Sequence, residues 1–369
     1  AAGATVDLDA AADLLPPFAA TRGVPQDPRF HAEGDVFIHT GLVVRALEAD
    51  PVYRAAGPDR RHRLMLAALL HDVGKSGTTR HNPDGTISSH GHARRGAQDS
   101  RALLYRLGVD PMVRERVAGL VAAHMRPYRL LERPAPEVLA DRMSWEIDLD
   151  DLAVLARADA RGRETRDPAD RQDGIERIEL FEALLDERGI RGRPQRYADA
   201  GARMAYLERD GRYPRDLPTQ SPTGAHVRVL SGLPGSGKDS WLRANHPDLP
   251  VVSLDALRMQ LGIASTDADG QGKVIQAARE RAREHLRAGR AFAWNATNLS
   301  RDLRSRVIDL ARAYDAFVEI VHLETSWREL RRRNRSRAAA LPDAALARLL
   351  RRWEPAHDHE AHVLTRVTA

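Results

Sequence analysis

The sequence contains no cysteine. This absence excludes disulfides, thiolate zinc sites and a cysteine nucleophile, so any metal must be held by histidine and carboxylate oxygen. A reducing compartment fits the composition. Long apolar runs are also missing: residues 1–20 are interrupted by acidic residues and Pro16-Pro17 and have no basic start. No later segment approaches the ~20 apolar residues that a membrane helix needs. We therefore expect a soluble, cytoplasmic protein with no membrane partner.

Lysine is scarce: Lys75, Lys238 and Lys273 are the only lysines among the 57 basic residues. The net charge of +5 hints at a polyanionic partner. The excess of arginine over lysine is more typical of a compositional bias of the whole genome, so we give the bulk charge little weight. Two of the three lysines lie inside the two motifs described below, where a compact, mobile ammonium suits phosphate.

The length and the hydrophobic pattern predict two domains. A chain of 369 residues exceeds the size at which one hydrophobic core stops growing. From about residue 42 to 185, apolar residues recur three and four apart, which predicts an all-helical domain. Within it, Asn82-Pro-Asp-Gly85 is a strong turn signal and predicts a small hairpin or an ordered loop.

A change of pattern marks the second domain. Residues 189–224 are rich in Gly, Pro and Arg, with a short helix expected around 198–208. Short apolar runs then alternate with helical stretches, which is typical of a parallel α/β sheet. The expected strands cover residues 227–230, 251–254, 291–294 and 317–323. The predicted domain boundaries are 1–190 for the helical domain, 191–224 for the connecting segment and 225–369 for the α/β domain.

The helical domain contains a candidate metal site. His71-Asp72 follows the apolar helical stretch 64–70, and His39 and Asp159 lie on predicted helices upstream and downstream. Neutral imidazole and carboxylate are the ligands that a hydrolytic divalent ion uses where thiols are absent. Four such ligands leave positions open for water and a phosphate oxygen. One such histidine would more often be an ordinary helix-end residue, but the whole set favours a site.

The order of these residues resembles the HD phosphohydrolase superfamily, and within it the HD domains attached to bacterial tRNA nucleotidyltransferases. The matching elements over about residues 30–165 are His39, His71-Asp72-Val-Gly-Lys75, Asp84-Gly85, Gly91-His92, Gly96-Ala97, His124-Met125 and Ala158-Asp159-Ala160. The resemblance implies one or two divalent transition metals. His39, His71, Asp72 and Asp159 would hold one metal, His92 and His124 would hold a second or contact phosphate, and Lys75 would contact phosphate. His31, His81 and His90 fit no motif position and are expected in loops.

The α/β domain contains a P-loop pattern. Gly232-Leu-Pro-Gly-Ser-Gly-Lys238 follows the first expected strand and precedes an expected helix, the context that separates a true P-loop from a chance glycine pattern. Backbone N–H groups would cradle the phosphates and Lys238 would reach the β- and γ-phosphates of ATP or another NTP. The predicted nucleotide-binding residues are Gly232, Gly235, Ser236, Gly237, Lys238, Asp239 and Ser240.

One position departs from the usual pattern. Asp239 stands where Ser or Thr normally binds the nucleotide's Mg²⁺ or Mn²⁺, and the hydroxyl comes one residue later, as Ser240. Two alternatives follow: the metal is held through water, as in adenylate kinases, or Asp239 takes a direct role.

Asp255 and Arg258 are the candidate acceptor-side residues. Asp255 follows the second expected strand, at the crevice where ligands of open α/β sheets bind. It could take the proton from an attacking hydroxyl, and Arg258, one helical turn further, could hold an anionic group of the same acceptor.

Residues 228–363 resemble the 5′-hydroxyl polynucleotide kinases of phage and bacterial RNA repair. The further elements are Asn295-Ala-Thr297-Asn298-Leu299 and Arg333-Asn334-Arg335-Ser336-Arg337. The resemblance implies that Arg333 and Arg337 stabilise charge on the transferred phosphoryl group, and we place Asn298 with Arg258 on the acceptor side. Ala296 replaces an aspartate of the phage enzymes, with Asn295 as a candidate substitute. Trp353 either stacks on a base or belongs to the core.

Together the motifs predict an all-α HD domain followed by an α/β P-loop kinase domain. Such a pair would heal nucleic-acid ends: it would remove a 2′,3′-cyclic, 2′- or 3′-phosphate and phosphorylate a 5′-hydroxyl. The expected partners are RNA or DNA ends, an NTP and, from the resemblance alone, a polynucleotide ligase. The alternatives are a nucleoside or antibiotic kinase fused to an HD nucleotide phosphohydrolase, and a nucleic-acid sensor with a degenerate HD site.

Overall fold

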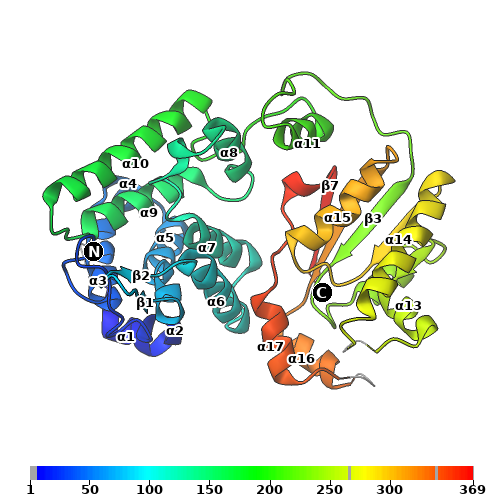
Figure 1. Cartoon of the computed structure of the whole chain (residues 1–369), viewed down its shortest axis with the longest axis horizontal. Helices are drawn as coiled ribbons and strands as arrows, with labels where there is room; N and C mark the ends of the chain where they lie inside the picture. The colour runs from blue at the N-terminus through cyan, green and yellow to red at the C-terminus, as the bar shows by residue number, and fades with distance from the viewer. Residues whose placement is uncertain (1–5, 265–266, 337–339, 369) are drawn as a thin grey trace. The chain divides into compact units, whose positions relative to one another are not determined.

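The computed structural model describes residues 6–264, 267–336 and 340–368. The chain divides between Gln195 and Arg196 into two compact units, a helical first unit and an α/β second unit (Figure 1). In the described part of the chain, no helix has both the length and the apolar character needed to cross a bilayer.

The first unit is a bundle of helices with one small hairpin. Its elements are α1 (Leu8–Leu14), α2 (Pro16–Ala19), α3 (Val36–Ala49), α4 (Pro51–Ala55), α5 (Pro58–Leu70), η1 (Val73–Gly77), β1 (Arg80–His81), β2 (Ile87–Ser88), α6 (His92–Arg106), α7 (Pro111–Ala123), η2 (Leu130–Glu132), α8 (Pro136–Met143), α9 (Leu149–Gly162) and α10 (Pro168–Arg188). The predicted all-helical domain is confirmed. The hairpin is antiparallel, and Gly85 takes the left-handed conformation in the predicted turn (φ 83°).

Aspartate N-caps explain where several helices begin. Asp50, Asp110 and Asp167 each accept hydrogen bonds from backbone N–H groups at a helix start and are each followed by proline at the first helical position. The carboxylate satisfies N–H groups that have no partner within the helix, and proline has the right φ and needs no donor there. The apolar faces of these helices, with Leu64 and Leu152 among them, form one core.

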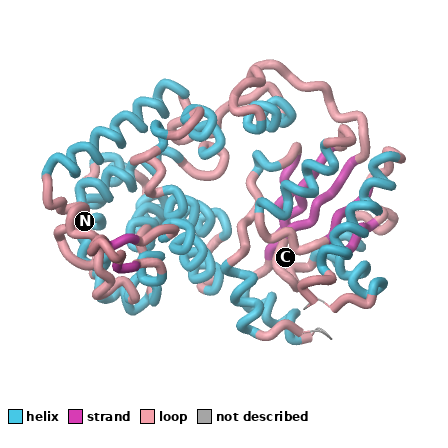
Figure 2. Tube along the Cα trace, viewed as in Figure 1, coloured by secondary structure: helices cyan, strands magenta, loops and turns pink. Residues whose placement is uncertain are grey.

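The second unit is built on a five-stranded parallel sheet with the strand order β4-β5-β3-β6-β7. Its elements are α11 (Ala200–Glu208), β3 (His226–Ser231), α12 (Lys238–Asn245), β4 (Val251–Ser253), α13 (Leu254–Leu261), α14 (Gln271–Arg287), β5 (Phe292–Asn295), α15 (Arg301–Arg312), β6 (Phe317–Glu324), α16 (Trp327–Arg335), α17 (Asp343–Arg351), η3 (Asp358–Glu360) and β7 (Val363–Thr368). Figure 2 shows the strands side by side with helices around them.

The sheet is buried on both faces near the P-loop strand. Val227 and Val229 of β3 pack into the larger core, and Leu230 into a smaller cluster on the opposite side, which includes Leu242 of α12. The four predicted strands and the parallel sheet are confirmed. The fifth strand, β7, was not predicted, although residues 363–368 carry a short β-branched pattern.

The expected helix of the connecting region exists as α11 and packs within the second unit. Met204 belongs to the larger core, and the Arg203 guanidinium donates to the backbone oxygens of Asp358 and Ala361, each at 2.8 Å. Much of the region between the two predicted domains is therefore an integral part of the α/β unit.

Candidate functional sites

Asp72 lies at the centre of four histidines in the first unit. Its Oδ2 is 3.8 Å from His39 Nε2 and 3.3 Å from His71 Nε2. Its Oδ1 is 3.4 Å from His92 Nε2 and 3.6 Å from His124 Nε2. Each carboxylate oxygen thus faces two imidazole nitrogens. Four histidines from four widely separated segments thus converge on Asp72 through the same atom, Nε2.

The opposite ring nitrogens of the histidines are anchored, which leaves Nε2 directed inward. In three histidines Nδ1 lies 2.7 to 2.8 Å from a backbone oxygen three residues earlier: His71 from Ala68, His92 from Ser89 and His124 from Val121. His39 is different, because it lies within α3, where the backbone oxygens are engaged by the helix. Its Nδ1 lies 2.7 Å from Glu33 Oε1 instead. A partner at one nitrogen selects the tautomer that leaves the other free to bind metal.

Asp159 completes the cluster from α9. Its Oδ1 is 3.1 Å from His39 Nε2, and its Oδ2 accepts hydrogen bonds from the Tyr128 hydroxyl at 3.1 Å and the Arg163 guanidinium at 2.6 Å. Lys75 donates to Gln26 Oε1 and lies 2.7 Å from Asp72 Oδ2. Two cations therefore flank the cluster, one beside each carboxylate.

The charged groups compensate for one another. Burial disfavours ionised Asp72, yet Lys75 and the histidines hold its pKa well below the usual range. Burial likewise opposes ionised Asp159, but Arg163 and His39 keep its pKa well below normal. Burial lowers the pKa of His92 to about 4, so this imidazole is neutral at neutral pH. Ionised carboxylates and neutral imidazole are the forms that bind metal.

The donor set fits a divalent ion. Among the described residues, His71 Nε2 and Asp72 Oδ1 have no hydrogen-bond partner although both are buried. Such atoms in a native protein require an explanation, and a ligand is one. Two groups of donors have the spacing of a metal site and share Asp72: His39 with His71, and His92 with His124. When bound, a divalent ion would lower the pKa of its water and stabilise charge on a phosphoryl group.

A glycine permits the close approach of two site elements. A Cβ at Gly74 would lie 2.1 Å from the backbone oxygen of His92 and 2.5 Å from the backbone nitrogen of Gly96. Glycine at this position therefore lets η1, which follows Asp72, lie directly against the start of α6, which carries His92.

Sequence patterns did not identify five residues that surround this cluster: Gln26, His31, Glu33, Tyr128 and Arg163. His31 was expected in a loop without a role, yet its Nδ1 lies 2.9 Å from Glu33 Oε1 and its ring is 4.6 Å from that of His39. Burial opposes ionisation of Glu33, but hydrogen bonds with His31 and His39 lower its pKa. The signals available in the sequence were Arg163, one helical turn after Asp159, and an acidic residue six positions before His39, which no motif includes.

The P-loop of the second unit joins β3 to α12. Gly237 has a φ of 101° and Gly232 a φ of 150°. A Cβ at Gly232 would also lie only 2.4 Å from the backbone oxygen of Leu323. These positions require glycine. The Lys238 ammonium donates to the backbone oxygens of Gly232 and Leu233 at 2.9 and 3.1 Å. Lys238 therefore folds back over the loop that would hold the phosphates. Ser236 is buried in the same loop.

The unusual Asp239 contacts the end of β5. Asn295 Nδ2 donates to Asp239 Oδ1 at 2.5 Å. Ser240 is exposed, and its hydroxyl accepts from Arg243 at 3.4 Å. Asn295 was considered as a replacement for the aspartate missing at Ala296, and its contact is with the P-loop residue.

Arg333 lies over the P-loop. Its Nη1 is 3.5 Å from the Gly235 backbone oxygen, and its Nε donates to Glu329 at 2.6 Å. Asn334 is buried and exchanges two hydrogen bonds with the backbone of Leu341. Arg337, the other predicted phosphate contact, lies outside the described residues.

The acceptor-side residues differ in exposure. Asp255 lies in the first turn of α13, two residues beyond the end of β4, with 81% of its side chain exposed. It forms an ion pair with Arg258, which also donates to Gln271 at 2.9 Å. Asn298 is buried, and its amide donates to the Leu230 backbone oxygen at 2.6 Å. This contact holds the loop after β5 against β3 and engages the side-chain nitrogen, so the predicted acceptor contact gains no support. Trp353 is buried and stacks on His322, in agreement with the core alternative.

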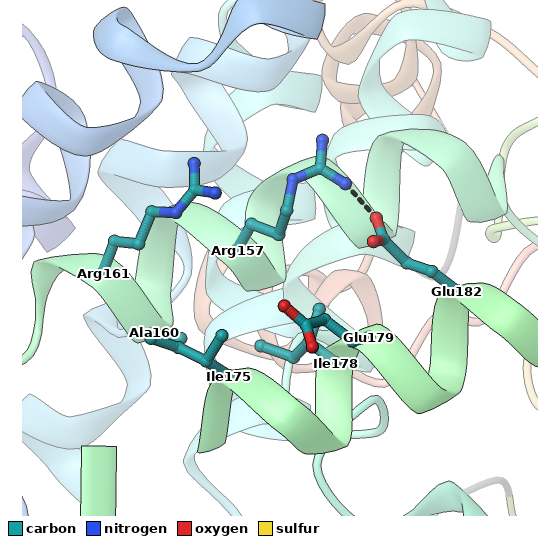
Figure 3. A pocket seen from close by; sticks show the side chains of 7 residues that line it. All are labelled: Arg157, Ala160, Arg161, Ile175, Ile178, Glu179 and Glu182. Atoms are coloured by element: carbon teal, nitrogen blue, oxygen red, sulfur yellow. Dashed lines mark hydrogen bonds and ion pairs between the residues drawn. The ribbon is translucent and has the colours of Figure 1, made fainter. Parts of the chain in front are cut away.

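A pocket between α9 and α10 contains none of the candidate site residues (Figure 3). It is lined by Arg157, Ala160, Arg161, Ile175, Ile178, Glu179 and Glu182. Arg157 pairs with both Glu182 and Asp50. Its charge is thus already compensated within the protein.

Comparison with known proteins supports this division of the chain. Residues 36–160 match the model of the HD domain, and residues 227–356 match that of an AAA domain. A "Multifunctional CCA protein" of Laribacter hongkongensis is 33% identical over 186 residues, which make up 49% of this chain and 42% of that protein. An "A-adding tRNA nucleotidyltransferase" of Deinococcus radiodurans is 35% identical over 127 residues, 34% of this chain and 29% of that protein. The chain thus spans less than half the length of these relatives.

Among solved structures, a gluconokinase from Sinorhizobium meliloti aligns with 41% of this chain and 84% of its own at 22% identity and a TM-score of 0.28. The match to the HD domain model and the identity to the two curated relatives confirm the predicted HD domain and its likeness to tRNA nucleotidyltransferases. The chain therefore combines a helical HD domain with an α/β P-loop domain.

Proposed function

We propose that this protein heals nucleic-acid ends with two activities. The HD unit would hydrolyse a 2′,3′-cyclic, 2′- or 3′-phosphate, and the P-loop unit would transfer the γ-phosphoryl group of an NTP to a 5′-hydroxyl. The observation that carries the first activity is the convergence of four Nε2 atoms on the two oxygens of Asp72.

The hydrolytic step needs a water, a bound phosphate and compensation of charge. Water would attack phosphorus, the P–O bond to a ribose oxygen would break, and that oxygen would receive a proton. A cyclic phosphate would need two such hydrolyses, the first opening the ring to a monoester and the second releasing inorganic phosphate. His39, His71, Asp72 and Asp159 would hold one divalent ion, while His92 and His124 have the position to hold a second. Lys75 and Arg163 are oriented by Asp72 and Asp159 and would supply the positive charge that a phosphate oxygen needs.

The kinase step would add a phosphoryl group instead of removing one. The 5′-oxygen would attack the γ-phosphorus, the bond from that phosphorus to the β,γ-bridging oxygen would break, and Asp255 would take the hydroxyl proton. Lys238 and Arg333 would stabilise the phosphoryl charge from two sides of the P-loop. Release of Asp255 from Arg258 would let the arginine bind the acceptor's phosphodiester.

The two activities are complementary because many endonucleases leave both kinds of end at one break. Ligation needs the cyclic phosphate removed and the 5′-hydroxyl phosphorylated. The names of the curated relatives, a CCA protein and an A-adding tRNA nucleotidyltransferase, support RNA ends as the first substrates to try. A polynucleotide ligase is the partner that this product would require.

The test supplies an oligonucleotide with a 5′-hydroxyl and a 2′,3′-cyclic phosphate to the wild type, Asp255→Ala and the His71→Ala/Asp72→Ala double variant. We expect each variant to lose one activity and keep the other, measured by ³²P transfer and by release of phosphate. If the wild type phosphorylates only nucleosides or an antibiotic, the rival small-molecule kinase is correct. If it hydrolyses nothing with any divalent ion, the HD site is degenerate.

A further inference from the structure

Asp239 stands at the position where P-loop enzymes usually bind the magnesium of the nucleotide. P-loop enzymes usually hold the nucleotide's magnesium with a Ser or Thr directly after the P-loop lysine and with an aspartate from elsewhere in the domain. This chain has a carboxylate directly after Lys238, where the hydroxyl belongs. The next hydroxyl, that of Ser240, is exposed and accepts a hydrogen bond from Arg243.

Asp239 has a side-chain partner at the carboxyl end of the neighbouring strand. Asn295 is the last residue of β5, and β5 pairs in parallel with the P-loop strand β3, with Trp294 beside Val229. The amide of Asn295 donates to Asp239 Oδ1 at 2.5 Å. The side chain at the end of the neighbouring strand and the side chain after the lysine therefore meet at the carboxyl ends of the strands, where ligands of such sheets bind.

We infer that Asp239 supplies the carboxylate ligand of the nucleotide-bound magnesium and that Asn295 orients it. In this arrangement the acid directly follows the P-loop lysine, and a neutral amide stands at the end of the neighbouring strand. The inference rests on the proposed NTP-dependent kinase activity and names the metal ligand of that site.

The chemistry of the two side chains supports this exchange. Magnesium prefers one or two carboxylate oxygens together with water and phosphate oxygens. Within the described part of the chain, Asp239 uses only Oδ1 in a hydrogen bond, and its side chain is exposed at the loop that would hold the phosphates. Oδ2 is thus left to face an ion, while Asn295 holds the carboxylate in one orientation.

The experiment measures binding of ATP to the full chain by calorimetry, with and without Mg²⁺, together with the Mn²⁺ EPR spectrum of the ATP complex. The variants are Asp239→Asn, Asp239→Ser and the exchange variant Asp239→Ser/Asn295→Asp. Glu324→Gln serves as a matched control, because Glu324 ends β6, the strand on the other side of β3.

We expect Asp239→Asn and Asp239→Ser to weaken Mg²⁺-dependent ATP binding at least about tenfold, since even residues outside the first coordination sphere cost 10- to 100-fold. Binding of metal-free ATP should persist in both. The exchange variant should recover most of the lost affinity, because it restores one hydroxyl and one acid at the same two places. Glu324→Gln should behave as the wild type.

Two results would overturn the inference alone: wild-type Mg²⁺-ATP affinity in Asp239→Asn, or a larger loss in Glu324→Gln than in Asp239→Asn. Failure of the exchange variant to exceed Asp239→Ser would also count against it. If the wild type binds no nucleotide under any condition, the proposed kinase fails as well, and this outcome is distinct from the others.

Discussion

The two candidate sites differ in how completely they are formed before any ligand arrives. In the HD unit every candidate ligand except the half-buried His92 is buried. Each histidine has its second nitrogen anchored, and each carboxylate has a cation beside it. In the P-loop unit the acceptor-side pair Asp255 and Arg258 lies at the surface, and the two side chains bind each other.

This difference fits the chemistry that we propose for each site. A metal cluster needs its ligands deprotonated and oriented in advance, because reorganising buried charges costs free energy at every turnover. A kinase must admit a large polyanion beside the NTP and close afterwards, so its acceptor side has to be open when empty. Mutual pairing keeps Arg258 beside Asp255 while Asp255 stays exposed.

The largest predicted effect is a loss of stability on breaking a buried ion pair in the second unit. We assign this pair a structural role, in contrast to the buried charges of the candidate site in the HD unit. Arg304 and Glu360 of the second unit form a fully buried, two-pronged ion pair at 2.7 and 2.8 Å. Arg304→Met should destabilise this unit by about 3–5 kcal/mol, because it leaves Glu360 buried without its partner. Urea unfolding followed by tryptophan fluorescence measures this, since four of the five tryptophans lie in the second unit.

The double variant Arg304→Met/Glu360→Leu is the control for that prediction. It removes the uncompensated charge and should recover part of the loss. A cost below about 1 kcal/mol for the single variant, typical of exposed pairs, would contradict the structural role.

The next prediction tests how closely η1 packs against the start of α6 in the HD unit. Gly74→Ala should cost about 3 kcal/mol, because the new Cβ would overlap the backbone at His92 and Gly96. It should also abolish phosphate release by displacing His92. Gly77→Ala, in the same short helix but with nothing within 4 Å of its new Cβ, should change little. Thermal unfolding by circular dichroism compares the two, and equal melting temperatures would refute the packing argument.

A smaller effect is expected from the residue that anchors His39. Glu33→Gln should weaken Mn²⁺ binding to the HD unit about 10- to 100-fold, as is typical for a carboxylate behind a metal-binding histidine. His31→Ala removes only the other partner of Glu33 and should have a weaker effect. Calorimetric titration with Mn²⁺ in the absence of nucleotide gives both affinities. The reverse order of the two losses would show that His31 is the more important of the pair.

The smallest effect on stability is predicted for Asp255, on the exposed acceptor side of the P-loop unit. Asp255→Asn should change the free energy of unfolding by less than about 1 kcal/mol, since it breaks only an exposed ion pair. It should nevertheless eliminate phosphoryl transfer. Asp302→Asn breaks a similar exposed pair with Arg306 on α15 and should retain transfer. Kinase assays and urea unfolding of both variants measure this contrast, and a kinase-active Asp255→Asn would remove the proposed base.

The elements that the sequence predicted are those with strong local signals. Alternation of strand and helix patterns predicted four of the five strands, and the turn residues around Gly85 predicted the hairpin. The short strand β7 escaped because it follows a segment without helical or turn periodicity, and pairing with β6 stabilises it. The candidate metal ligands of the HD unit were predicted from residue type, from their order along the chain and from the resemblance to HD domains.

The local sequence determined which segments would be helices and strands, where the P-loop lies and which side chains could bind metal. Helices, strands and the P-loop depend on residues close together in the chain, whereas the candidate metal ligands were recognised by residue type and by their order along the chain. Only the tertiary structure decided that Glu33 anchors His39, that Tyr128 binds Asp159, and that Asn295 meets Asp239. Those contacts join residues that are distant in sequence or outside any periodic pattern, and packing of whole helices and strands brings them together.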